Sequence, residues 1–432
     1  MLEPISVDRK LAVVAGAWRR WLRRHHLGED PFQPYLELVS KDTFQQLTDL
    51  PDYDPLRAPL RRWFFCLLEQ RVNARGLALV AASRRVEQHV VERPEYGRFT
   101  LAELLSRALA EPARRQDWLA AFVARARACA ELTRELWQRR AEVARRLEED
   151  GSLALPGIDP AEHATELLRH TQELADQLDT PDLGALVTCA LAGDASEGWP
   201  ARLTLRNLAD LFGETPLLQG LPLDPDPLPG LYGGASFLRA FSTLGAAFAR
   251  AAGPADQPFC VSVDPFRLRE HELAALFALL PLTPAFARRG LGLSGERRET
   301  QLRALSRAML IEVRTRALCA KLRTAALSGS SAFVEAFEET SAQAFGFCPD
   351  ARIAGALWHV HVDAAQRYAG LLTAAAKHEE LTEQHDEDWY RNPRAVDQLR
   401  AETRLPPATT VSDADLDRGR AALRRLLAPG FD

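Results

Sequence analysis

Apolar side chains recur every three or four residues through most of this chain, which is the spacing of helices that bury one face. In residues 9–26, for example, Leu11, Val14, Trp18 and Trp21 share one stripe among arginines. The pattern predicts helices at 9–26, 35–49, 58–93 (broken or bent near Gly76), 101–110 after an N-cap at Thr100, 114–149 before Gly151, 160–178 after Asp159, 235–250, 267–280, 296–325, 331–345, 363–384, 394–402 and 413–427 after Ser412.

Two stretches depart from the helical pattern. Residues 258–263 (PFCVSV) are bounded by prolines and are the clearest strand candidate, and residues 179–232 are rich in proline and glycine. We therefore predict a mainly α protein with a small β element. Its predicted divisions are an N-terminal helical region (1–178), an extended crossing segment (179–232) and a C-terminal helical region (233–432).

Composition narrows the functional classes. The chain has 432 residues, a net charge of −5 and a pI of about 6.1, so it has no overall basic character for nucleic acid. The short basic run at 19–26 surrounds the apolar stripe of a helix, which does not change that expectation. No apolar run is long enough to cross a bilayer, no secretory signal pattern opens the chain, and its six cysteines are widely spaced. We expect a cytoplasmic protein with reduced thiols, no membrane contact and no nucleic-acid partner.

Residues 233–277 carry the most informative pattern. GGASFLRAFSTLGAAFARA is followed, after a short connection, by DPFRLREHELAALFALL. This framing resembles the oligoendopeptidase F and thimet-oligopeptidase superfamily of zinc peptidases. In that superfamily a Gly-Gly segment leads into a helix that bears His-Glu-x-x-His, and a second helix bears a Glu. The resemblance implies a helical, gluzincin-type architecture with a central cleft.

The zinc-binding residues of that motif are replaced in this chain. Two histidines at i and i+4 share a helix face and can bind one ion, and the intervening glutamate can accept a proton from metal-bound water. The resemblance puts Ser242 and Ala246 at the histidine positions and Thr243 at the glutamate. It puts His271 at the third-ligand position, between Glu270 and Glu272, where a shift of one residue would restore a carboxylate. We therefore predict no bound metal and no cofactor, and list these four positions as degenerate catalytic positions.

The resemblance extends into the C-terminal half, where residues 291–327 and 387–402 are similar to a long helix and a Trp-aromatic, Arg-Asn-Pro-Arg segment of the superfamily. Substrate-orienting His and Tyr residues of the superfamily lie in the region of LWHVHVDAAQRYAG. His359, His361 and Tyr368 are therefore candidate ligand-binding residues, together with Glu270 and Glu272. A structural role for the His-x-His pair is the alternative. His163 and His170, seven residues apart, are expected to be solvated helix positions.

Three functions follow. The first is a catalytically inactive metallopeptidase-like protein that binds a peptide, a protein segment or a partner enzyme, such as a catalytically intact paralogue. The second is an active zinc peptidase with relocated ligands from His271, Glu272, His359 and His361, in which case zinc is the cofactor. The third is an all-helical adaptor unrelated to peptidases. We favour the first because fold and site chemistry are separable.

Overall fold

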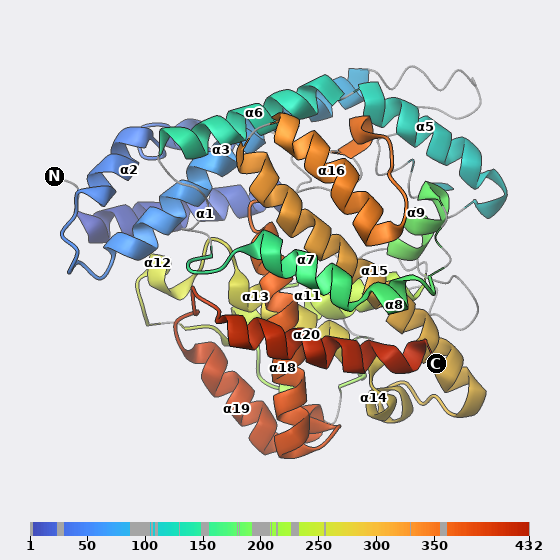
Figure 1. Ribbon diagram of the computed structural model, residues 1–432. Coiled ribbons are helices and arrows are strands. Elements are labelled where there is room, and N and C mark those ends of the chain that lie inside the picture. The colour runs from blue at the N-terminus through green and yellow to red at the C-terminus, as the bar shows by residue number, and fades with distance from the viewer. Residues whose placement is uncertain are drawn as a thin grey trace.

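The computed structural model describes residues 3–23, 30–86, 111–128, 130–147, 155–178, 182–191, 215–225, 233–254, 256–328, 330–354 and 361–431, with a few single residues between these ranges. This part of the chain contains helices and no strand (Figure 1). The α-helices are α1 Pro4–Arg23, α2 Lys41–Thr48, α3 Arg57–Val86, α5 Arg115–Ala128, α6 Ala130–Arg146, α7 Pro160–His170, α8 Gln172–Ala175, α9 Leu183–Leu191, α11 Gly234–Ala252, α12 Phe259–Ser262, α13 Leu268–Leu279, α14 Pro284–Arg289, α15 Gly295–Ser328, α16 Ser330–Phe345, α18 Ala364–His385, α19 Pro393–Arg404 and α20 Asp413–Leu427. The predicted mainly α class is confirmed.

Several predicted helix starts coincide with observed caps. The Asp159 carboxylate accepts hydrogen bonds from the first backbone N–H groups of α7, and the Ser412 hydroxyl accepts one from Asp415 in α20. Thr100 and Gly151, predicted to begin and end helices, lie outside the described residues. Helix α3 passes through Gly76 without a break, so the two predicted segments there are one helix.

The predicted β element is wrong. Phe259–Ser262, the centre of the expected strand, is the single helical turn α12. The Asp8 carboxylate of α1 accepts hydrogen bonds from the backbone N–H groups of Phe259 and Cys260 at 2.9 and 2.7 Å. A carboxylate at this position satisfies the first N–H groups of a helical turn, which an isolated strand would leave without partners. The expected extended segment 179–232 likewise contains a helix, α9.

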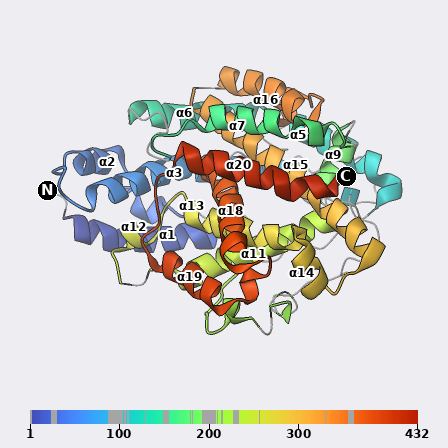
Figure 2. The same ribbon diagram turned by 60° about the horizontal axis from the view of Figure 1, so that its bottom comes forward.

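Three apolar clusters occur among the described residues: two large cores, and a small cluster around Trp118 and Phe122 of α5. The larger core joins α7, α11, α13, α15, α18 and α20, with members such as Phe241, Leu276, Ile311 and Leu372. The smaller core lies under α1, α2, α3 and α12, at one end of the molecule (Figures 1 and 2). The larger core contains residues from either side of the predicted boundaries at 178 and 232. The division of the chain into three regions stays a prediction.

A buried cluster of charged side chains links α3 to α6 and α15. Glu69 of α3 accepts hydrogen bonds from Arg140 of α6 and Arg323 of α15 at 2.6–2.8 Å. All three side chains are at most 5% exposed. The two guanidinium groups outweigh the burial that would raise the pKa of Glu69, and they hold it below its usual range. Because a buried charge without a partner is costly, this triad fixes α3 against α6 and α15.

Three helices of the larger core meet almost backbone to backbone. A Cβ atom on Gly245 of α11 would lie 2.3 Å from the carbonyl oxygen of Leu273 in α13. A Cβ atom on Gly370 of α18 would lie 2.8 Å from the backbone nitrogen of Glu272, also in α13. Only glycine permits such approaches, so these two positions set the spacing of α11, α13 and α18. Among the described residues, no helix is both long enough and apolar enough to span a membrane.

Candidate functional site

A cavity of about 390 Å³ lies between α11, α13, α15 and α18. Its volume falls in the range typical of small-molecule sites, which is roughly 300–1,000 Å³. Both apolar and charged side chains line it: Ala235, Leu238, Arg239, Ser242, Thr243, Ala275, Ala278, Ala308, Met309, Glu312, Arg316, Arg367 and Leu371. The two helices that carry the degenerate positions 242, 243 and 271 therefore border this cavity.

Two of the degenerate catalytic positions face this cavity. Ser242 and Thr243 line it, one turn after Arg239 on the same helix. The Thr243 hydroxyl donates a hydrogen bond to the carbonyl oxygen of Arg239 at 3.0 Å, so it is engaged by its own helix. Ala246 follows one turn later and is half-buried. This stretch of α11 presents hydroxyl and methyl groups where the resemblance implies metal ligands.

Charged side chains from three helices complete the lining. Arg239 comes from α11, Glu312 and Arg316 from α15, and Arg367 from α18. Glu312 accepts a hydrogen bond from Arg316 at 2.8 Å, and Arg316 also donates to the backbone oxygen of Arg367 at 3.2 Å. Burial would raise the pKa of Glu312, but the three surrounding guanidinium groups outweigh it and hold that pKa below its usual value. Glu312 is therefore ionised near neutral pH.

His271 lies beside this lining in a polar network. Its Nε2 atom is 2.8 Å from Oδ2 of Asp363, at the start of α18. Asp363 also pairs with Arg267 at 2.6 Å and with Arg367 at 2.9 Å. Burial lowers the pKa of His271 to about 4 despite the opposing effect of Asp363, so the ring is neutral at pH 7. A neutral ring that donates to Asp363 positions the carboxylate between two arginines.

The two glutamates beside His271 point into different surroundings. Residues 271, 275 and 278 share one face of α13, and the last two line the cavity. Glu272 is offset from that face, and burial raises its pKa while Lys377 and Arg269 oppose the rise. Glu270 accepts a hydrogen bond from Arg250 at 2.7 Å and lies 3.5 Å from Arg267. His271, between them in sequence, thus shares the face of α13 that lines the cavity.

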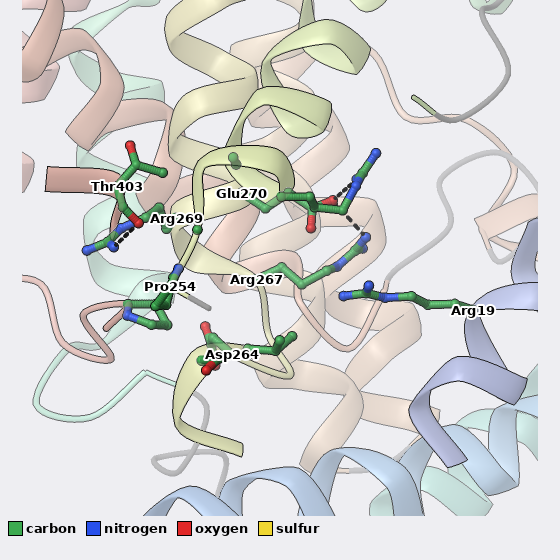
Figure 3. Close-up of a pocket in the computed structure, with 13 residues that line it drawn as sticks. Arg19, Pro254, Asp264, Arg267, Arg269, Glu270 and Thr403 are labelled. Carbon is green, nitrogen blue, oxygen red and sulfur yellow. Dashed lines mark hydrogen bonds and ion pairs between the residues drawn. The ribbon is translucent and has the colours of Figure 1, made fainter. Parts of the chain in front are cut away.

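Glu270 belongs to a second, smaller pocket of about 140 Å³ (Figure 3). Arg19 of α1 reaches toward it from one side and Arg269 from the other, with Arg267 and Glu270 between them. Arg267 has a left-handed backbone (φ 58°, ψ 35°), which is strained for a residue other than glycine. Its pairing with both Glu270 and Asp363 offsets this strain.

Two other predicted site residues, Tyr368 and His361, are not among the described residues that line the cavity. Tyr368 is fully buried, and burial raises the pKa of its hydroxyl, with Arg420 and Glu166 as charged neighbours. It lies on the side of α18 that faces α7 and α20, and its role in ligand binding stays a prediction. His361 is half-buried just before α18, and His359 lies outside the described residues.

Zinc does not fit the donor set around the cavity. Two hydroxyl groups, a methyl group and a histidine already bound to Asp363 do not provide three good ligands. Within the described ranges, the group of three metal-type ligands found is His163, Glu166 and Asp417, on α7 and α20. Arg420 pairs with all three, which makes them a salt-bridge network, and His163 also bonds to Asp413.

The charged lining of the cavity was not found from the sequence. Arg239, Ser242 and Ala246 recur at helical spacing, as do Glu312 and Arg316, so each set shares a helix face. That signal is weak in a chain with only four lysines among 54 basic residues, because arginines occupy nearly every basic position. Contact between the four helices is what gives these side chains a shared environment.

Comparison with known proteins places the fold. No protein-family model and no curated protein matches the sequence. Among solved structures, the M32 carboxypeptidase from Deinococcus radiodurans R1 aligns over 99% of this chain and 98% of its own, with a TM-score of 0.53 and 12% identity. A carboxypeptidase from Pyrococcus furiosus aligns over 100% and 99%, with a TM-score of 0.45 and 12% identity. The first likeness shows that this chain has a helical, peptidase-like fold, as predicted.

Proposed function

We propose that this protein is a non-catalytic, metallopeptidase-like protein that binds a peptide or protein segment in the cavity between α11, α13, α15 and α18. The observation that carries the proposal is the lining itself. Ser242 and Thr243 occupy the wall where the resemblance implies a zinc ligand and a general base, and the cavity remains about 390 Å³ in volume. Two hydroxyl groups without a bound metal or a general base do not activate water, so the remaining use for this cavity is binding.

The likeness to a carboxypeptidase supports a peptide as the ligand. That neighbour acts on peptides, as its name states, and its fold extends over nearly the whole of this chain. A cavity that keeps polar groups among apolar ones suits a peptide backbone and its side chains. We place the protein in the cytoplasm, and a catalytically intact paralogue is a candidate partner.

The first test measures catalysis and metal together. Protein purified without a His-tag would be incubated with excess zinc, desalted and analysed by mass spectrometry for bound metal. The same sample would be incubated with a defined pool of synthetic octapeptides, and cleavage followed by liquid chromatography. We expect far less than one zinc per chain and no cleavage above a buffer control. One zinc per chain with chelator-sensitive cleavage would establish the relocated-ligand peptidase instead.

The second test measures binding in the cavity. The same peptide pool would be passed over immobilised protein, and the retained peptides identified. Ser242→Trp fills the cavity from α11 and should abolish retention. Thr165→Trp, at an exposed position of α7, is the matched control and should retain the same peptides as the wild type. Equal retention by both variants would contradict binding at this cavity.

A further inference from the structure

The deeper part of the cavity between α11, α13, α15 and α18 is apolar. The apolar residues of its lining are Ala235, Leu238, Ala275, Ala278, Ala308, Met309 and Leu371. Each of them is at most 6% exposed, whereas the side chains of Glu312 and Arg367 in the same lining are 39% and 34% exposed. The apolar groups therefore form the floor of the cavity, and these charged groups lie nearer to its mouth.

Alanine side chains create much of the space above this floor. Four alanines line the cavity, one from α11, two from α13 and one from α15. Ala308 stands four residues before Glu312 on α15, so the two side chains share a helix face. A larger side chain at any of the four positions would project into the cavity. Small residues on three helices thus leave room for a side chain that comes from a ligand.

The charged groups of the lining already have partners within the protein. Glu312 accepts a hydrogen bond from Arg316 at 2.8 Å, and Arg367 donates one to Asp363 at 2.9 Å. Glu312 also opposes the lowering of the Arg239 pKa by burial. A charged ligand would compete with these contacts and would lose its own hydration on entering. The lining therefore favours an uncharged group at the floor.

An apolar side chain gains the most free energy from such a site, because the gain grows with the apolar area removed from water. An apolar protein cavity of about 150 Å³ already accepts a benzene molecule. This cavity, at about 390 Å³, has room for a large apolar side chain and part of the adjoining peptide backbone. The Ser242 hydroxyl lies in the same lining and is a hydrogen-bond donor suited to a backbone carbonyl.

We propose that the cavity selects a peptide segment by one large apolar side chain, of the size of leucine or phenylalanine, which packs against the alanines, Met309 and Leu371 of the floor. This inference rests on the proposed peptide-binding function and names its ligand class. The peptide backbone lies nearer to the mouth, beside Ser242 and the Glu312–Arg316 pair. Charged side chains are disfavoured because the floor offers them no partner among its lining residues.

The experiment uses capped heptapeptides, Ac-Gly-Ser-Ala-Xaa-Ala-Ser-Gly-NH₂, in which the central residue is leucine, asparagine, glutamate or lysine. Leucine and asparagine have nearly the same shape, so they differ mainly in polarity. Isothermal titration calorimetry with the full-length protein would measure each affinity. We expect the leucine peptide to bind at least about ten-fold more tightly than each of the others, as for burial of one aliphatic side chain.

Two variants of the floor alter the cavity in opposite directions. Ala308→Leu fills it and should remove the preference for leucine over asparagine, a loss of about ten-fold. Met309→Ala enlarges it and should raise the affinity of the tryptophan analogue relative to the leucine peptide, a gain that a damaged fold cannot produce. Ala120→Leu, at an exposed position of α5, is the matched control and should change no affinity.

Four results would overturn the inference. Binding of the asparagine, glutamate or lysine peptide as tightly as the leucine peptide would remove the apolar preference while leaving peptide binding intact. A leucine preference that Ala308→Leu leaves unchanged would place the contact outside this cavity, and an unaltered ratio of tryptophan to leucine binding in Met309→Ala would do the same. Absence of binding by every peptide would reject the proposed function together with the inference.

Discussion

Nε2 of His271 lies 2.8 Å from Oδ2 of Asp363, and this contact joins α13 to the start of α18. Because the side chain of Asp363 is only 5% exposed and also bonds to Arg267 and Arg367, the carboxylate organises three partners from two helices. The burial that would raise its pKa is outweighed by the two arginines, and the pKa of Asp363 lies well below its usual range. This cluster joins α13 and α18 through polar contacts, and the same two helices also meet closely at Gly370.

Asp363→Asn should destabilise the protein strongly. The substitution keeps the shape of the side chain but leaves Arg267 and Arg367 without their shared counter-charge. Removing one partner of a buried ion pair typically costs about 3–5 kcal/mol. Urea unfolding followed by circular dichroism would measure the loss. Asp413→Asn, at an exposed partner of His163, should cost less than about 1 kcal/mol. Similar losses for the two variants would refute the central role of Asp363.

Stability should fall as the pH is lowered from about 6.5 to 4. Burial lowers the pKa values of His271 and His378 to about 4, whereas both would titrate near 6.5 in the unfolded chain. The unfolded chain therefore binds more protons in this window, and the stability present above pH 6.5 is lost progressively toward pH 4. The full effect is on the order of 3 kcal/mol for each histidine.

Urea unfolding at several pH values would check this slope. His271→Gln and His378→Gln should each reduce it by about one proton, since each removes one depressed titration. The groups around His271 are Asp363, Arg367 and Arg267, and those around His378 are Trp389 and Glu379. A slope that neither substitution changes would mean that other groups control the acid response.

Gly245→Ala should separate α11 from α13. The added methyl group would lie 2.3 Å from the Leu273 carbonyl oxygen, a distance that backbone atoms can relieve only by moving apart. Overpacking of this kind typically costs about 1–3 kcal/mol. Gly16→Ala in α1 is the matched control, because its methyl group would meet only the Arg20 side chain at 3.6 Å. That substitution should stabilise the helix by about 0.5–1 kcal/mol. Thermal unfolding of both variants would show shifts of opposite sign.

Restoring the motif residues tests the register of the resemblance. Ser242→His with Ala246→His would put two imidazoles at i and i+4 on α11, and Thr243→Glu would return the general base. If His271 stands at the third-ligand position, the triple variant should bind about one zinc per chain, measured by competition with a chromogenic chelator. Adding His271→Gln should then weaken zinc binding markedly. If Glu272→Gln weakened it instead, the register would be displaced by one residue.

Helix positions could be predicted from the sequence because burial of one helix face leaves a periodic pattern in it. Helices α11, α13, α18 and α20 appear within a few residues of their predicted bounds. The wrong prediction of a strand at 258–263 has a physical cause. Its apolar residues face the small core, and the group that makes them helical, Asp8, is about 250 residues away in sequence. Local composition contains no trace of that contact.

The candidate site also has a part that the sequence predicts and a part that depends on tertiary contacts. The positions of Ser242, Thr243 and His271 come from the resemblance to zinc peptidases, and two of them line the cavity. The partners Arg316 and Arg367 come from α15 and α18, and only tertiary packing brings them to the same hollow. Tyr368 is close in sequence to other predicted site residues, but this proximity does not tell which side of α18 it faces.

The contact between Asp8 and α12 constrains the order in which the molecule can assemble. Helix α1 precedes the amides that Asp8 binds, at Phe259 and Cys260, by about 250 residues, so it leaves the ribosome long before them. The Asp8 carboxylate therefore gains these two partners only after about 250 further residues have been translated, although α2 and α3 can pack against α1 earlier. Closing such a long loop is entropically unfavourable, so this step should be among the slower ones in folding. Cellular chaperones would have their greatest influence on the protein during that interval.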